Sequence, residues 1–159
     1  MLIIHGTAAF RAKVPGPSAE GAASTTALGA WYAGIVRRRR PLALLVNERT
    51  LLPVLMPLAP AKTLVERFPE EAAEVMGALD VPEAFIEHEV SAMRQPRIAS
   101  TADRSLVAVM NQMTRMLDRW RIEQDTDLLD LALWLAQMPT SKLQYRSPDR
   151  ELQQLVGGA

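Results

Sequence analysis

The chain contains no cysteine, and this absence excludes three kinds of chemistry. Disulfide bonds, thiolate metal ligands and a cysteine nucleophile all require that residue. Aromatic residues make up only 5% of the 159 residues, which gives little support to a surface that stacks the bases of single-stranded nucleic acid. No apolar run approaches the roughly 18–20 residues of a membrane-spanning helix. We therefore expect a cytoplasmic protein that has no membrane partner.

The net charge is zero, with 18 basic and 18 acidic side chains, which argues against a surface that is basic all over. The two signs are nevertheless separated along the chain. Residues 1–62 carry eight basic and two acidic side chains, and residues 63–159 carry ten basic and sixteen acidic ones. Such a split indicates either a basic binding face or two parts of one domain with complementary potentials. The candidate basic patch is the run Arg37, Arg38, Arg39 and Arg40.

Short apolar runs predict the strands of a small sheet. They lie at residues 1–5, 42–47 and 51–57, and 96–100 reads as a further edge strand. The polar link at 47–50 joins two of them as a hairpin. The expected fold class is α+β, with a small antiparallel sheet that a helical C-terminal part covers. We expect a single domain over residues 1–156, with mainly strands and one helix in 1–58 and mainly helices in 59–156.

Helical periodicity predicts most of the remaining elements. Apolar side chains at i, i+3, i+4 and i+7 favour a helix over residues 27–36, which would end in the arginine run. A later segment, 128–138, is apolar on most sides and is expected to be a central helix. Further helices are predicted at 61–68, at 69–80 with Pro69 in the first turn, at 82–93, at 103–122 and from 148 onward.

Three segments carry a resemblance to a known family. They read STTALGAWY at residues 24–32, LLVNERTLLPVLMPLAPAKT at 44–63 and TADRSLVAVMN at 101–111. Over residues 1–138 the chain resembles a family of small bacterial proteins, the domain of unknown function DUF6933. The hairpin and the helix from 103 are similar, more weakly, to pRiA4b ORF-3-like proteins. The resemblance implies a shared fold and carries no activity with it.

Polar side chains near the predicted hairpin and the predicted helix 103–122 form a candidate binding site. Together they would surround a small anionic ligand at a helix N-terminus. The same residue types are also typical of turns, caps and buried hydrogen bonds, so a structural role is the alternative. The candidate polar site is Thr25, Asn47, Arg49, Arg104, Ser105 and Asn111.

Catalytic signatures are missing from the sequence. His5 could act as a general base, with a hydroxyl of residues 24–26 as nucleophile and Glu48 as its orienting group. The chain has no nucleophile elbow, no phosphate-binding glycine motif and no His-Glu-x-x-His zinc signature. His88 lies in the run Glu-His-Glu, which reads as a solvated helix face. We predict no catalytic residue, no metal site and no cofactor. The missing catalytic motifs favour a protein that is not an enzyme.

The leading functional interpretation is a non-enzymatic protein-interaction or regulatory module of a bacterial cytoplasm, with a protein partner or a homo-oligomer. It rests on the missing motifs, the charge split and a methionine-rich stripe at residues 110, 113 and 116. One alternative is a nucleic-acid-binding protein that uses the arginine run. Another is a small anion-binding protein or enzyme with a site at Thr25, Asn47 and Arg104.

Overall fold

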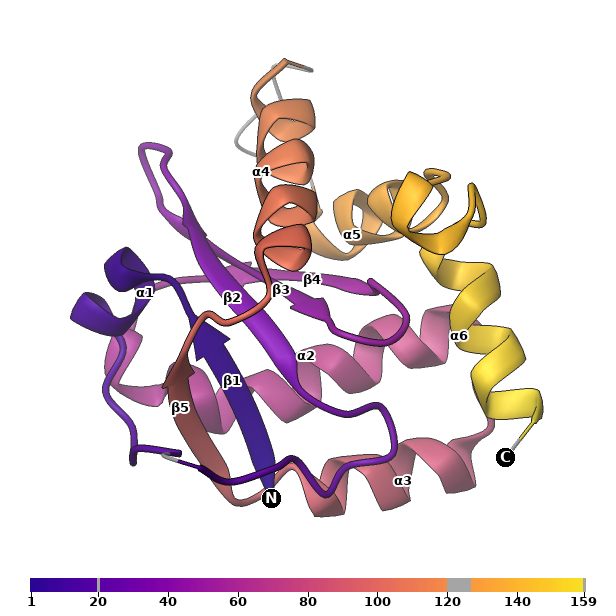
Figure 1. The fold of residues 1–159 in the computed structure, drawn as a ribbon, viewed down its shortest axis with the longest axis horizontal. Helices are drawn as coiled ribbons and strands as arrows, with labels where there is room; N and C mark the ends of the chain where they lie inside the picture. Colours follow the sequence, from indigo (N-terminus) through magenta and orange to yellow (C-terminus); the bar gives the residue numbers. More distant parts are fainter. Residues whose placement is uncertain (20, 120–126, 159) are drawn as a thin grey trace.

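A computed structural model describes residues 1–19, 21–119 and 127–158 of the chain. A five-stranded sheet forms its centre (Figure 1). The strands are β1 (Leu2–Gly6), β2 (Trp31–Val36), β3 (Leu42–Asn47), β4 (Pro53–Pro57) and β5 (Pro96–Ser100). They are arranged in the order β4-β3-β2-β1-β5. The predicted strands at 42–47 and 96–100 are confirmed, and so is the α+β class.

The sheet is mixed, which corrects the expectation of an antiparallel one. β1 pairs in parallel with both of its neighbours, β2 and β5, whereas β2, β3 and β4 pair antiparallel through two hairpins. The difference arises from the connections, because parallel neighbours need a long crossover. Residues 7–30 connect β1 to its parallel neighbour β2. The other parallel neighbour of β1, β5, follows in the chain only after β2, β3, β4, α2 and α3.

The predicted helix at 27–36 is wrong, because residues 31–36 form β2. In a strand, alternate side chains point to opposite faces. Trp31 and Ala33 lie in the core on one face, and Tyr32 and Val36 lie in the core on the other face. A strand that is buried on both faces is continuously apolar, so it also satisfies the helical spacing that the sequence shows.

Helices cover both faces of the sheet (Figure 1). On one face, α2 (Leu64–Ala78) and α3 (Glu83–Ala92) contribute to a core in which Phe68 meets Trp31 edge to face, with ring centroids 5.0 Å apart. On the other face, α4 (Arg104–Arg119) packs Leu106, Met110 and Met113 over β2 and β3. α6 (Pro148–Gly157) adds Leu152 to the first core.

The position of helix α5 (Leu128–Ala136) in the fold explains why its sequence is apolar on most sides. It packs against the edge strand β4 and contributes to both cores. Ala132 and Ala136 belong to the core on the α2 side, while Leu131 and Leu135 belong to the core on the α4 side. The expectation of a helix in the middle of the packing is therefore confirmed for residues 128–136.

The helices at residues 61–80 and 8–13 differ from the prediction. Residues 61–80 contain a short 3-10 turn (η1, Ala61–Thr63) and one continuous helix, α2, with Pro69 inside it and not at its start. A short helix, α1 (Ala8–Lys13), forms where no helix is predicted, and Thr7 caps it by accepting from the Phe10 amide. Residues 120–122 of the predicted helix 103–122 lie outside the described residues.

The free side of β5 carries a further stretch of backbone. Ile98 donates its amide to the Pro17 carbonyl at 2.7 Å and accepts from the Ala19 amide at 3.0 Å. Ser18 thereby forms a parallel bridge with Ile98. At the opposite edge, β4 begins and ends with prolines and packs against α5. In the described part of the chain, no helix has both the length and the apolar character needed to cross a membrane.

Candidate functional site

The arginine run forms the turn between β2 and β3 and does not end a helix. Val36 at the end of β2 pairs with Leu42 at the start of β3. Since β1 pairs with β2 only as far as Ala33, the end of β2 and its turn extend past β1 (Figure 1). Arg37, Arg39 and Arg40 are exposed, and Arg38 is half-buried. We call residues 37–40 the arginine tip.

Further basic side chains lie at the same edge of the sheet. We name this edge, at which the parallel strands β1, β2 and β5 end, the carboxyl edge, and the opposite one the amino edge. Helix α1 follows the end of β1 and packs against β2, with Arg11 and Lys13 exposed. Residues 1–19 and 21–47 contain no acidic side chain. The elements that form this part of the carboxyl edge thus carry charge of one sign only.

Asn47 lies at the amino edge, at the end of β3, and is fully buried. Its amide nitrogen donates to the carbonyls of Leu28 at 2.9 Å and Ala30 at 3.3 Å. Its amide oxygen accepts from the backbone amides of Arg49 and Thr50 and from the Thr50 hydroxyl, at 2.9–3.1 Å. The side chain therefore closes its own turn and attaches it to the loop before β2, which leaves it no group for a ligand.

The two residues after Asn47 bind the same loop. Glu48 accepts from the Ala30 amide at 2.8 Å, and Arg49 donates to the Ala27 carbonyl at 3.0 Å. From the other side, the buried carboxylate of Glu89 in α3 accepts from the amides of Ala27 and Leu28. A buried carboxylate that accepts from backbone amides is satisfied without a cation. This arrangement fixes residues 27–30 in front of β2.

Gly29 is the residue of that loop which must be a glycine. Its φ of +80° lies in the left-handed region, which side chains rarely adopt. A Cβ atom at this position would lie 2.5 Å from the Oε1 atom of Glu48 and 3.1 Å from the Nε atom of Arg49. The close approach shows that Glu48 and Arg49 pack directly on this glycine.

Thr25 also lies at the amino edge, where it holds the start of β1. Its hydroxyl accepts from the amino group of Met1, and its backbone amide donates to the Met1 carbonyl at 2.9 Å. The neighbouring Ser24 hydroxyl donates to the same carbonyl at 3.2 Å. These hydroxyls bind the backbone of Met1, the residue before β1, so the region near residue 25 is a structural junction.

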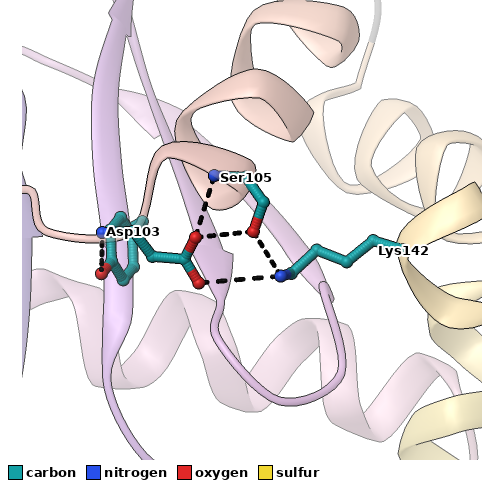
Figure 2. A network of polar contacts seen from close by, with 4 residues as sticks. Asp103, Ser105 and Lys142 are labelled. Atoms are coloured by element: carbon teal, nitrogen blue, oxygen red, sulfur yellow. Dashed lines mark hydrogen bonds and ion pairs between the residues drawn. The ribbon is translucent and has the colours of Figure 1, made fainter.

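The other candidate residues lie at the carboxyl edge, where α4 begins. Asp103 precedes the helix, accepts from the Ser105 amide at 2.9 Å and from its hydroxyl at 2.6 Å, and pairs with the Lys142 ammonium at 3.6 Å (Figure 2). Lys142 also donates to the Ser105 hydroxyl. The backbone amide of Asp103 donates to the Tyr32 hydroxyl at 3.0 Å. Arg104 and Asn111 are exposed on α4.

The electrostatics of this network favour an ionised Asp103. The hydrogen bond from the Ser105 hydroxyl is the main reason that the pKa of Asp103 lies below its ordinary value, and the nearby Lys142 charge adds to the effect. The carboxylate also lies at the positive end of the α4 dipole. Asp103, Ser105 and Lys142 therefore satisfy one another and connect the start of α4 to the 3-10 turn η2 (Ser141–Leu143).

The six residues of the candidate polar site do not form one site. Thr25, Asn47 and Arg49 lie at the amino edge, and the other three follow β5 at the carboxyl edge. His5 is at the carboxyl edge too, where its Nδ1 atom lies 2.9 Å from the Ser100 carbonyl and its ring stacks on Tyr32. The hydroxyls of residues 24–26 are at the opposite edge, so the structure does not bring His5 to them.

Comparison with known proteins adds the family. The family model of the domain of unknown function DUF6933 matches residues 3–151. The chain belongs to this family. No curated protein and no solved structure matches the chain. The weaker resemblance to pRiA4b ORF-3-like proteins stays a prediction.

Three polar residues of this DUF6933 chain were not identified from the sequence. Glu89 is the most buried of them, and its role depends on a loop 61 residues away, so no local pattern indicates it. Lys142 likewise reaches Asp103 and Ser105 only in the folded protein. Asp103 could have been identified as a helix cap from the sequence. It directly precedes a segment of helical apolar periodicity, and Asp at such a position is a signal for the start of a helix.

The described residues of the DUF6933 domain contain no group of three His, Asp or Glu side chains that could hold a metal ion. His88 and Glu87 are exposed on α3, whereas Glu89 turns into the core. The prediction that this run is a solvated helix face is therefore wrong for Glu89, because three consecutive side chains of a helix point in different directions. Exposed basic side chains are concentrated at the arginine tip, with Arg37, Arg39 and Arg40, and on the neighbouring α1, with Arg11 and Lys13.

Proposed function

We propose that this DUF6933 domain is a non-enzymatic interaction module of a bacterial cytoplasm whose contact element is the arginine tip. The observation that carries the proposal is the exposure of Arg37, Arg39 and Arg40 on a turn that extends beyond the end of β1. The planar guanidinium group presents its donors in a geometry that matches carboxylates and phosphates, so it can bind them in a bidentate manner. The partner is therefore an anionic surface.

The absence of an assembled catalytic set in the described residues supports a binding role. The buried amide of Asn47 and the carboxylates of Glu48 and Glu89 are engaged with backbone groups of residues 27–30. Asp103, Ser105 and Lys142 are engaged with one another. These groups stabilise the fold, and a regulatory or recruiting activity needs none of them to react.

An acidic protein surface is the first candidate for the partner. The tip presents four consecutive arginines on the turn between the paired residues Val36 and Leu42. This contact surface is narrow and suits a small group of carboxylates. Opposite potentials across an interface accelerate encounter and select the partner. A second copy of the chain also offers carboxylates, since residues 63–159 carry the acidic excess, so a homo-oligomer is included in this proposal.

The test compares two triple variants of equal charge. In R37A/R39A/R40A the exposed arginines of the tip are removed, and in R104A/R115A/R119A three exposed arginines of α4 are removed. Fluorescence anisotropy measures binding to labelled poly-L-glutamate over a range of salt concentrations. We expect the tip variant to lose at least about tenfold in affinity and the α4 variant to stay within about threefold. Equal losses in both variants would contradict a contact at the tip.

Nucleic acid is the second candidate, because the tip shares its edge with Arg11 and Lys13, and α1, β2 and β3 carry no acidic side chain. Such a surface can follow a phosphate backbone. With a labelled 20-base-pair duplex as probe, each arginine that contacts a phosphate contributes about 0.9 to the slope of log K against log salt. A slope that falls in R37A/R39A/R40A, with no binding to poly-L-glutamate, assigns the tip to nucleic acid.

A further inference from the structure

A second, independent feature lies at the other end of the chain, between the end of α5 and the start of α6. A hollow of about 370 Å³ opens there, within the size range of small-molecule sites. It is lined by one amide, one aromatic ring, two guanidinium groups, a hydroxyl and a proline. These residues are Gln137, Pro139, Tyr145, Arg146, Ser147 and Arg150.

The aromatic ring in this lining is unusually exposed. Tyr145 exposes 76% of its surface, and it is the exposed large hydrophobic residue among those that the structure describes. An exposed ring beside a hollow offers a flat apolar face on which another planar ring can stack. The position therefore suits a ligand that contains such a ring.

The backbone holds Tyr145 in this position at a conformational cost. Gln144 and Tyr145 have φ angles of 54° and 64°, in the left-handed region that residues other than glycine seldom adopt. The Tyr145 amide donates to the Thr140 carbonyl at 2.8 Å, and the Thr140 amide donates to the Arg146 carbonyl at 3.2 Å. Strained backbone of this kind is concentrated at functional sites.

The charges in the hollow favour an anionic group. Arg146 uses its Nε atom to bind Glu151 at 2.8 Å, which leaves its terminal nitrogens for a further partner. Arg150 is exposed, and its side chain forms no hydrogen bond or ion pair with the residues that the structure describes. The carboxylate of Asp149 is engaged with the Ser147 hydroxyl and the Arg150 amide. Two guanidinium groups thus line the hollow with donors to spare.

We propose that this hollow binds a small molecule that carries a planar ring and a phosphate or carboxylate group. The ring stacks on Tyr145, and the anionic group binds the guanidinium groups of Arg146 and Arg150. The amide of Gln137 lies in the same lining and can both donate to and accept from the edge of the ring. The site is separate from the arginine tip, and the proposal does not depend on the function assigned to that tip.

Another hollow of similar size differs in the chemistry of its lining. The groove between α2 and α3 measures about 410 Å³, but it contains no aromatic ring, and its charged residues are Glu66, Glu70 and a single arginine, Arg94. The mixed charges and missing ring give no matching ligand chemistry there. The hollow beside Tyr145, in contrast, combines a ring, two guanidinium groups and strained backbone.

Calorimetric titration with four probes tests the proposal. Adenosine monophosphate supplies the ring and a phosphate, adenosine the ring alone, inorganic phosphate the anion alone, and benzoate a ring with a carboxylate. We expect adenosine monophosphate or benzoate to bind at least about tenfold more tightly than adenosine and phosphate. Which of the two binds more tightly tells whether the anionic group is a phosphate or a carboxylate.

Two exposed-residue variants separate the two halves of the ligand. R150A should bind adenosine monophosphate no better than adenosine, and Y145A should bind it no better than phosphate, whereas Y145F should retain the stacking. R115A, which removes an exposed arginine from α4, is the matched control and should bind like the original chain. Urea unfolding confirms that each variant is folded. Equal affinity in all variants, or no binding of either ring-bearing anion at millimolar concentration, would overturn the proposal.

Discussion

At the scale of single residues, Asn47 joins two segments that the sequence separates. Its side chain binds the carbonyls of Leu28 and Ala30 and closes the turn at residues 47–50. The sequence predicts a turn there and offers a binding role beside it. It does not indicate the loop before β2 as the partner, because that contact depends on the pairing of β2 with β3.

The first prediction concerns this amide. Asn47→Ala removes the side-chain partner of the Leu28 carbonyl and of the amides of Arg49 and Thr50, and we expect a loss of about 2–4 kcal/mol in the free energy of unfolding. Asn111→Ala, which changes the same residue type on the exposed face of α4, should alter it by less than about 0.5 kcal/mol. Urea unfolding curves measure both, and similar losses in the two variants would contradict the role of Asn47.

The second prediction compares two glycines. Gly29→Ala places a Cβ 2.5 Å from the Glu48 carboxylate at a φ of +80°, so we expect a loss of about 1–3 kcal/mol. Gly77→Ala lies within α2 with no atom within 4 Å of the added Cβ, and it should gain about 0.5–1 kcal/mol from reduced backbone freedom in the unfolded chain. Thermal and urea unfolding should show opposite signs, and a shared sign would count against this account.

At the scale of elements, β3, β5 and the helices α3 and α5 were predicted near their observed positions. Their apolar runs are bounded by prolines or polar residues, which act locally. β2 was missed because both of its faces are buried, and the parallel pairing of β1 was missed because it depends on the route of residues 7–30. The residues of the candidate polar site lie apart for the same reason. The topology of the sheet places them at opposite edges, and no local sequence pattern indicates that topology.

The third prediction belongs to α2. Burial raises the pKa of Glu71, and the neighbouring charge of Glu74 raises it further. A raised pKa in the folded state means that ionisation of Glu71 opposes folding above that pKa, and the penalty disappears as the pH falls below the unfolded value. Because Glu71 is only partly buried, solvent screens these charges, and the attraction of Glu71 to Arg67 opposes the effect. Glu71→Gln should therefore stabilise the protein at pH 7 by only about 0.2–0.5 kcal/mol. Unfolding at pH 7 and at about pH 3.5 measures the gain, which should be absent at the lower pH.

At the scale of the whole molecule, two cores meet at one sheet, and α5 contributes to both. β1 lies inside the sheet, has a parallel neighbour on each side and is almost entirely buried. Elements of this kind open only when the whole structure unfolds. The short α1, by contrast, buries mainly Phe10 and is exposed along most of its length.

The fourth prediction follows from this arrangement. In native-state hydrogen exchange, we expect the amides of β1 and β2 to exchange with a free energy equal to that of global unfolding. The amides of α1 should exchange with a free energy at least about 2 kcal/mol lower, through local opening. Rapid exchange in β1 would show that the two cores do not unfold together.

The closed edges of the sheet limit how this protein can meet another chain. Residues 17–19 already occupy the hydrogen-bonding side of β5 at Ile98, and at the other edge β4 starts and ends with residues that have no amide proton. A foreign extended peptide therefore finds no free row of backbone groups at these places to join as a sixth strand. Recruitment through shared backbone pairing is disfavoured, and partners have to recognise side chains such as those of the β2–β3 turn.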